Sequence, residues 1–326
     1  MKKFKIFFIW FLFSAINLSV VNLELVAVEP EFAVSKKEIV LVRDVPANEK
    51  PPKNFRTADT IRSFLEGEKS VITAEGLIGL RASGSAQPSE RGLSWLKKRL
   101  GDDLIIMDLR QESHGFINGA AVTWYAPNNW INFGKTHEEA LLDESTRLDA
   151  LAQDNRVHLY DGKAIKHGIK DSGEVFEIKQ VRSEQQLNKQ NSIRYLRLMV
   201  PDHMRPSDEE VDRFIAFVRT LDDKDWLHFH CRAGMGRTTT FFVMYDMLRN
   251  ADKASLEDIV ARHATATPNY DLFKHREGPR KNGYLDRTNF IRRFYGYAKA
   301  FKRGENANWT EWLRKHERKI PGKTDK

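Results

Sequence analysis

One nine-residue stretch of the chain combines a nucleophile, a loop that can bind an anion, and a fixed positive charge. It lies between a predicted buried strand and a predicted helix at 237–249, and it consists of His230-Cys231-Arg232-Ala233-Gly234-Met235-Gly236-Arg237-Thr238. A helix N-terminus and nearby cations favour the nucleophilic thiolate form of Cys231, the only cysteine of the chain. Gly234 and Gly236 allow backbone N–H groups to turn inward around an anion, as in phosphate-binding loops. The stretch therefore predicts attack by a thiolate on a bound oxyanion.

The last two residues of the stretch complete this chemistry. Arg237 can hold two phosphate oxygens and stabilise the charge of a transition state. Thr238 can donate its hydroxyl to the sulfur of Cys231, which makes the sulfur a better leaving group in a second step. We expect His230 to support the loop geometry through hydrogen bonds rather than to bind a metal. The alternative, a buried and inert Cys231, leaves the two glycines, Arg237 and Thr238 unexplained.

The flanking segments predict the elements that must hold this stretch. Ser89 can cap a helix that carries leucines at helical spacing, and residues 207–210 form a capping-box pattern before an apolar stripe. Strands are predicted at 104–107, 193–200 and 226–229. The order strand, helix, strand, loop, helix predicts an α/β fold with a mainly parallel central sheet flanked by helices.

Residues 155–192 break this pattern, because strand-like segments at 157–160 and 175–178 are separated by Lys- and Gly-bearing loops. We expect a small β-rich insertion there, packed beside the main sheet. Residues 28–54 are rich in proline and charge and are predicted to form an N-terminal arm. The main domain is expected at 55–316, and a disordered tail at 317–326.

The first residues resemble a secretory signal peptide. Three lysines within the first five residues precede an apolar run at 6–15, and Ala27 offers a small residue at a cleavage position. A retained membrane anchor is the alternative, but Asn17 interrupts the apolar stretch, which is short for the about 20 apolar residues of a span. We expect residues 1–27 to be removed, and the protein to be periplasmic or secreted without stable membrane insertion.

The nine-residue stretch matches the signature H-C-x-x-G-x-x-R-[ST] and so resembles the protein-tyrosine-phosphatase-like cysteine phosphatases. Segments 80–89, 108–115 and 226–231 are similar to cysteine phytases, and the likeness extends over roughly residues 54–316. The resemblance implies a phosphatase core with an added partial β-barrel. It also implies hydrolysis of inositol hexakisphosphate through a phosphocysteine intermediate, without a metal or other cofactor.

A general acid is needed because an inositol alkoxide is a poor leaving group. Asp202 follows Pro201 in a loop after a strand, and this position resembles the mobile acid loop of the family. The resemblance also implies that His203 contacts the substrate. Val200 departs from the family, which often has an aromatic residue before Pro-Asp. The rival carboxylates Asp222, Asp223 and Asp225 are predicted at a helix end.

A substrate with several phosphates requires several cations. Arg232 stands directly after the nucleophile, where cysteine phytases commonly have Glu. The resemblance places Arg56 and Lys281 among substrate-binding basic residues, and Lys163 is a further candidate for this basic rim. The loop residues expected to bind the substrate are Arg232, Ala233, Gly234, Met235 and Gly236.

The formal net charge of +8 favours acidic partners. An inositol polyphosphate is the expected substrate. The alternative is a phosphotyrosine-protein or phosphoinositide phosphatase with the same mechanism. The intact signature argues against a non-catalytic phosphate-binding module. No basic stripe with interleaved aromatic residues supports binding of nucleic acid, and the ten histidines show no metal-ligand spacing.

Overall fold

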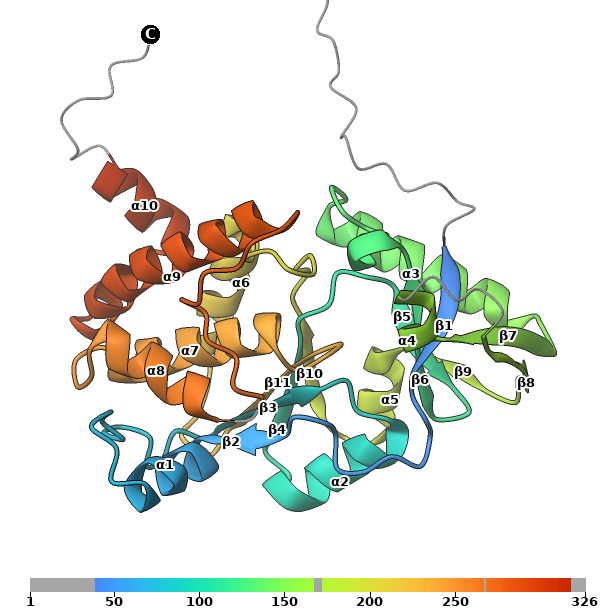
Figure 1. The fold of residues 1–326 in the computed structure, drawn as a ribbon, viewed down its shortest axis with the longest axis horizontal. Helices are drawn as coiled ribbons and strands as arrows, with labels where there is room; N and C mark the ends of the chain where they lie inside the picture. Colours follow the sequence, from blue (N-terminus) through green and yellow to red (C-terminus); the bar gives the residue numbers. More distant parts are fainter. Residues whose placement is uncertain (1–38, 167–171, 267, 318–326) are drawn as a thin grey trace, which may run out of the picture. The chain divides into compact units, whose positions relative to one another are not determined.

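The computed structural model describes residues 39–166, 172–266 and 268–317 (Figure 1). The predicted signal peptide, the first part of the predicted arm and the predicted tail from residue 318 lie outside these ranges. Within them, the strands form a five-stranded and a six-stranded sheet. None of the described helices is long and apolar enough to cross a bilayer.

The five-stranded sheet has the order β10-β4-β11-β3-β2. Its strands are β2 (Arg56–Thr57), β3 (Ala82–Ala86), β4 (Leu104–Asp108), β10 (Arg194–Arg197) and β11 (Trp226–Cys231). The four longer strands pair in parallel, and the short β2 pairs antiparallel with β3. The predicted mainly parallel sheet is thus present, and its central strand β11 ends at Cys231.

Helices cover both faces of this sheet because the side chains of β4 alternate between two apolar cores. Ile105 and Met107 face a large core with helices α1, α6, α7, α8, α9 and α10, whereas Leu104 and Ile106 pack with α2 and α5. The helices are α1 (Ala58–Gly67), α2 (Glu90–Leu100), α5 (Glu184–Gln190), α6 (Asp208–Val218), α7 (Gly236–Asn250), α8 (Leu256–Thr265), α9 (Lys281–Lys302) and α10 (Trp309–Glu317). This burial on both faces explains the uninterrupted apolar run of β4.

The six-stranded sheet has the order β8-β7-β1-β6-β5-β9. Its strands are β1 (Val40–Val45), β5 (His114–Ile117), β6 (Ala120–Tyr125), β7 (Arg156–Asp161), β8 (Glu174–Glu177) and β9 (Val181–Arg182). Helix α3 (His137–Ala152) packs on it through Leu148 and Leu151, and the short η2 (Pro127–Asn129) and α4 (Gly162–Lys166) follow β6 and β7.

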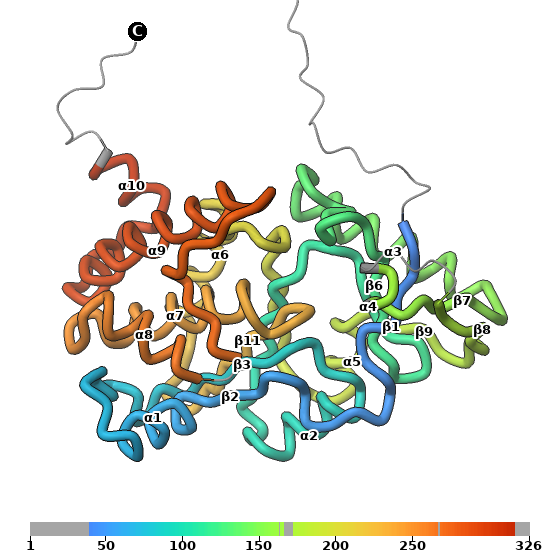
Figure 2. The backbone as a smooth tube through the Cα atoms, viewed as in Figure 1, coloured from blue at the N-terminus to red at the C-terminus, as the bar shows by residue number. Residues whose placement is uncertain are grey.

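This sheet is wider than the insertion predicted at 155–192. Its centre is β1, from the predicted arm, which pairs with β6 and β7. Figures 1 and 2 show this blue strand among green ones from the middle of the chain. The sheet extends beyond the predicted insertion because β1 buries Leu41 and Val42, whose partners come from strands that are distant in the sequence.

The two predicted N-caps differ in completeness. Ser89 accepts a hydrogen bond from the Gly92 amide, as predicted for the start of α2. Ser207 accepts from the Glu210 amide, but the reciprocal half of the predicted capping box is missing. The Glu210 carboxylate instead lies 2.8 Å from His137 Nδ1, and thereby connects α6 to α3.

Candidate active site

Cys231 lies at the end of β11 in the wall of a cavity of about 800 Å³, with 3% of its surface exposed. The loop that follows turns at Gly234, whose φ is +69°. A Cβ atom at Gly234 would lie 2.3 Å from the Ala86 amide nitrogen, so both the backbone angle and the space require glycine. The loop therefore passes directly against the end of β3.

Thr238 contacts the sulfur, and Arg56 holds the loop around it. Thr238 Oγ1 donates to Cys231 Sγ at 3.2 Å. Arg56 donates to the Gly234 carbonyl and to Thr239 Oγ1, both at 3.0 Å. Burial lowers the pKa of Arg56 to about 10, while the nearby Cys231 sulfur acts in the opposite direction. Arg56 is therefore still a cation at neutral pH.

This position corrects the expected placement of Arg56 on the basic rim. Its side chain is 2% exposed and does not line the cavity. Arg56 reaches the loop because β2 pairs with β3 beside β11. It braces the loop from below, and no sequence pattern indicates this burial.

Arg237 is held in a fixed orientation by carboxylates. Its two terminal nitrogens donate to Glu112 at 2.6 and 2.9 Å, and Nη2 lies 3.3 Å from Asp202 Oδ1. Burial lowers the pKa of Arg237, but Asp202, Glu112 and Cys231 outweigh this effect and raise it well above its usual value. The guanidinium is thus a permanent charge beside the loop.

Asp202 lies in the cavity wall, and its side chain is 25% exposed. The rival Asp222, Asp223 and Asp225 instead precede β11, at the opposite end of the strand from Cys231. Asp225 forms an ion pair with Arg194 there, and none of the three lines the cavity. Of the four candidates, only Asp202 is positioned near Cys231.

His203 also lines the cavity, beside the start of α9. Burial lowers its pKa, and Arg280 and Arg237 lower it further against the opposing Asp202. The neutral ring can accept a hydrogen bond, and Arg280 Nη1 lies 2.9 Å from its Nε2. Asp202 and His203 therefore present a carboxylate and a neutral imidazole side by side.

Basic side chains surround the cavity. Among the described residues its Arg and Lys lining is Arg43, Lys53, Arg232, Arg276, Arg280 and Arg287. Arg232 donates to Asp44 at 2.7 Å and stacks over the Tyr125 ring at 5.1 Å. Arg287 is 1% exposed, donates to Tyr270, and has two further nitrogens without a hydrogen-bond partner.

The other two expected rim residues differ in what the structure shows of them. Lys281 is not among the lining residues; its side chain is 45% exposed and forms an ion pair with Glu277 at 3.0 Å. The neighbouring Arg280 takes the cavity-facing place. Lys163 belongs to α4, and its side chain lies outside the described part of the chain.

Sequence reasoning missed Arg276 and Arg287, as well as Arg43 and Lys53. The signal for Arg287 was its helical spacing from Arg280 and Tyr284. Arg276 lies in the irregular segment before α9, so this spacing does not predict its position. No local signal points to Arg43 or Lys53, because they reach the cavity from the N-terminal segment.

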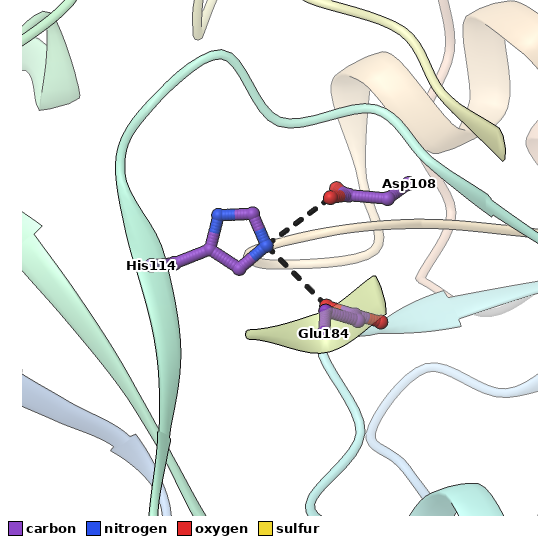
Figure 3. A group of neighbouring side chains, drawn as sticks. All are labelled: Asp108, His114 and Glu184. Atoms are coloured by element: carbon purple, nitrogen blue, oxygen red, sulfur yellow. Dashed lines mark ion pairs between the residues drawn. The ribbon is translucent and has the colours of Figure 1, made fainter. Parts of the chain in front are cut away.

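A buried charge cluster lies behind the loop (Figure 3). His114 Nε2 lies 3.1 Å from Asp108 and 3.3 Å from Glu184. Burial and Arg110 lower the pKa of His114, but Asp108 and Glu144 outweigh them and raise it to about 9. Metal ligation needs a neutral imidazole, so these three residues fit an ion-pair cluster better than a metal site. His230 joins the cluster, with Nε2 2.9 Å from Glu184.

Comparison with known proteins identifies the family. The family model for PTP-like phytases, whose description names inositol hexakisphosphate, matches residues 107–249. A solved PTP-like phytase from Bdellovibrio bacteriovorus is 36% identical, with a TM-score of 0.69 over 85% of this chain and 95% of that one. The chain belongs to the PTP-like phytase family. Both the predicted family and the α/β fold are therefore confirmed.

Two other relatives are longer than this chain. The PTP-like myo-inositol phosphatase from Mitsuokella multacida, solved with myo-inositol-(1,3,4,5)-tetrakisphosphate, is 29% identical, with a TM-score of 0.77 over 90% of this chain. The effector protein hopD2 from Pseudomonas syringae pv. tomato is 32% identical over 81% of this chain. The chain spans 50% of the Mitsuokella protein and 58% of hopD2.

Proposed function

We propose that this PTP-like phytase removes phosphates from myo-inositol hexakisphosphate through a phosphocysteine intermediate. The observation that carries the proposal is the wide cationic cavity that contains Cys231. A thiolate gives the nucleophile, and the surrounding arginines give binding sites for several phosphates of one substrate.

In the first step the Cys231 thiolate attacks phosphorus, so that a P–S bond forms as the bond to the inositol oxygen breaks. Arg237 binds equatorial phosphate oxygens, in an orientation set by Glu112. Asp202 donates its proton to the departing oxygen, because an alkoxide leaves poorly without one.

In the second step a water molecule attacks phosphorus and the P–S bond breaks. Asp202, now a carboxylate, takes a proton from this water. Thr238 already donates to the sulfur at 3.2 Å, and this hydrogen bond stabilises the departing thiolate. Inorganic phosphate is released and the acid is protonated again for the next cycle.

The cavity lining favours an inositol polyphosphate over a phosphotyrosine side chain. Six Arg or Lys side chains of the described residues line about 800 Å³, against the carboxylates of Asp44, Glu49, Asp161 and Asp202. Three of these carboxylates form ion pairs: Asp44 with Arg232, Glu49 with Lys53 and Asp202 with Arg237. A phosphotyrosine pocket instead requires a deep, narrow slot with accessible aromatic faces, whereas the lining tyrosines Tyr125, Tyr270 and Tyr284 lie against Arg232, Arg276 and Arg287.

The test is phosphate release by the purified protein from inositol hexakisphosphate and, in parallel, from a phosphotyrosine peptide. We expect a clear preference for the inositol compound. A preference for the peptide would retain the cysteine mechanism and reject the proposed substrate. Activity on neither would reject the enzyme assignment.

A further inference from the structure

The segment after β6 crosses from the six-stranded sheet to the loop that bears Asp202. Trp130 directly follows η2 and is largely buried, and its ring stacks on Phe133 with 4.9 Å between centroids. Its indole Nε1 donates to the backbone carbonyl of Asp202 at 2.8 Å. A rigid, packed side chain thus holds the backbone of the Asp202 loop.

Asn129, the residue before it, reaches the carboxylate of Asp202. Its Nδ2 donates to Glu112 Oε1 at 2.6 Å and lies 3.5 Å from Asp202 Oδ2. An ionised carboxylate only accepts hydrogen bonds, so the contact with Glu112 determines which end of the amide faces Asp202. Because Glu112 also orients Arg237, Asn129 aligns the acid with the phosphate-binding arginine.

The backbone is held in unfavourable angles where these two segments meet. Asn128 and Asn129 have φ values of +55° and +65°, and His203 has a φ of +70°. Positive φ is uncommon for residues other than glycine, and Asn tolerates it best. Such conformations persist only where the surrounding structure enforces them, and they cluster at functional sites.

We propose that Asn129 and Trp130 are positioning residues for proton transfer by Asp202, an inference that rests on the proposed function. Trp130 fixes the position of the Asp202 backbone, and Asn129 orients the Asp202 carboxylate. The six-stranded sheet then has a role in the chemical step as well as forming a wall of the cavity. Without these contacts, the partners left to Asp202 among the described residues would be Arg237, the His203 amide and, at 3.8 Å, the His203 ring.

The test is Trp130→Phe, which keeps the ring packing and removes the indole N–H. The matched control is Trp226→Phe, because Trp226 Nε1 donates to Ser83 Oγ, also at 2.8 Å, at the far end of β11. Substrates are phenyl phosphate and p-nitrophenyl phosphate, which differ mainly in how much the leaving oxygen needs a proton. The readout is kcat/KM, which reports on phosphorylation of the enzyme rather than on the later hydrolysis.

General acid catalysis contributes about 10²- to 10⁴-fold, and partial misalignment removes part of it. We expect Trp130→Phe to lose about tenfold on phenyl phosphate and much less on p-nitrophenyl phosphate. Trp226→Phe should change both equally. Equal losses on both substrates in Trp130→Phe, or no loss at all, would overturn the positioning role.

Asp202→Asn separates this inference from the proposed function. If Asp202→Asn shows no dependence on the leaving group, Asp202 is not the acid and the proposed mechanism fails. If Asp202→Asn shows the dependence and Trp130→Phe does not, only the positioning role fails. Should Trp130→Phe not fold, Asn129→Gly replaces it, since glycine tolerates the positive φ; the same selective loss is expected, and equal losses would overturn the role.

Discussion

Glu112→Gln is the most informative single change in the site, because this buried carboxylate accepts from three different side chains. Its Oε1 accepts from Arg237, Arg110 and Asn129, and its Oε2 accepts from Arg237 at 2.6 Å. A glutamine amide preserves the Oε1 contacts but brings its NH₂ against Arg237 Nη1. One charge-assisted hydrogen bond thereby becomes a contact between two donors.

The expected magnitude follows from the burial of the pair. Removing one partner of a buried ion pair costs about 3–5 kcal/mol, because the other charge is left uncompensated. Displacing a preorganised donor from a transition state costs about 10²- to 10³-fold in rate. We therefore expect a lower urea midpoint and a kcat/KM for p-nitrophenyl phosphate reduced by about two orders of magnitude.

The pH dependence adds a second measurement. Burial opposes ionisation of Glu112, but Arg237 and Arg110 hold its pKa well below the usual range. A carboxylate whose pKa is lowered in the folded state stabilises the fold at pH values above the usual carboxyl pKa. This stabilisation is lost as the pH falls and the carboxylate becomes protonated. The difference in unfolding free energy between wild type and Glu112→Gln should therefore narrow below pH about 4.

Asp246→Asn is the matched control, since Asp246 forms a buried ion pair with Arg262 between α7 and α8 and does not line the cavity. It should lower stability while changing kcat/KM far less. Full activity and an unchanged urea midpoint in Glu112→Gln would refute the assignment of Glu112 as the anchor of Arg237.

Three further predictions concern the loop and the cluster behind it. Gly234→Ala should abolish most activity, because the added Cβ would lie 2.3 Å from the Ala86 amide nitrogen; a wild-type kcat/KM would contradict this tight contact. Thr238→Ala should slow hydrolysis of the intermediate, seen as a p-nitrophenol burst before a slow steady state; a uniform slowing without a burst would exclude this role. Protonated His114, whose pKa is raised to about 9, stabilises the fold fully at pH values below its usual pKa of 6.5. The unfolding free energy of the wild type should therefore fall between neutral pH and pH about 9, and His114→Gln should remove this pH dependence.

The loop and the framework around it could be predicted because their signals are local. The Cys231 segment contains its nucleophile, glycines and arginine within nine residues, and the flanking apolar runs identify β11 and α7. Ser89 likewise caps α2 from an adjacent position. Such features depend on residues that are adjacent in the chain, and the pattern of those residues predicts the local backbone conformation.

The wall of the cavity could not be predicted, because its charges are paired across long sequence separations. Arg56 is buried through contacts with Gly234 and Thr239, which are 178 and 183 residues away in the chain. Asp44 engages Arg232 from β1, a strand whose place in the second sheet depends on non-local pairing. The sequence around a charged residue does not indicate whether that residue will contact water or a charged side chain far away in the chain.

Substrate binding and phosphate release by Cys231→Ser together test whether Cys231 is the nucleophile and the cationic cavity is the substrate site. Titration calorimetry with inositol hexakisphosphate measures binding, and a phosphate assay on the same sample measures turnover. We expect this variant to bind the compound, because the cationic wall is intact, and to release no phosphate. Continued phosphate release by Cys231→Ser would contradict the covalent mechanism, and loss of binding would contradict the assignment of the cationic cavity as the substrate site.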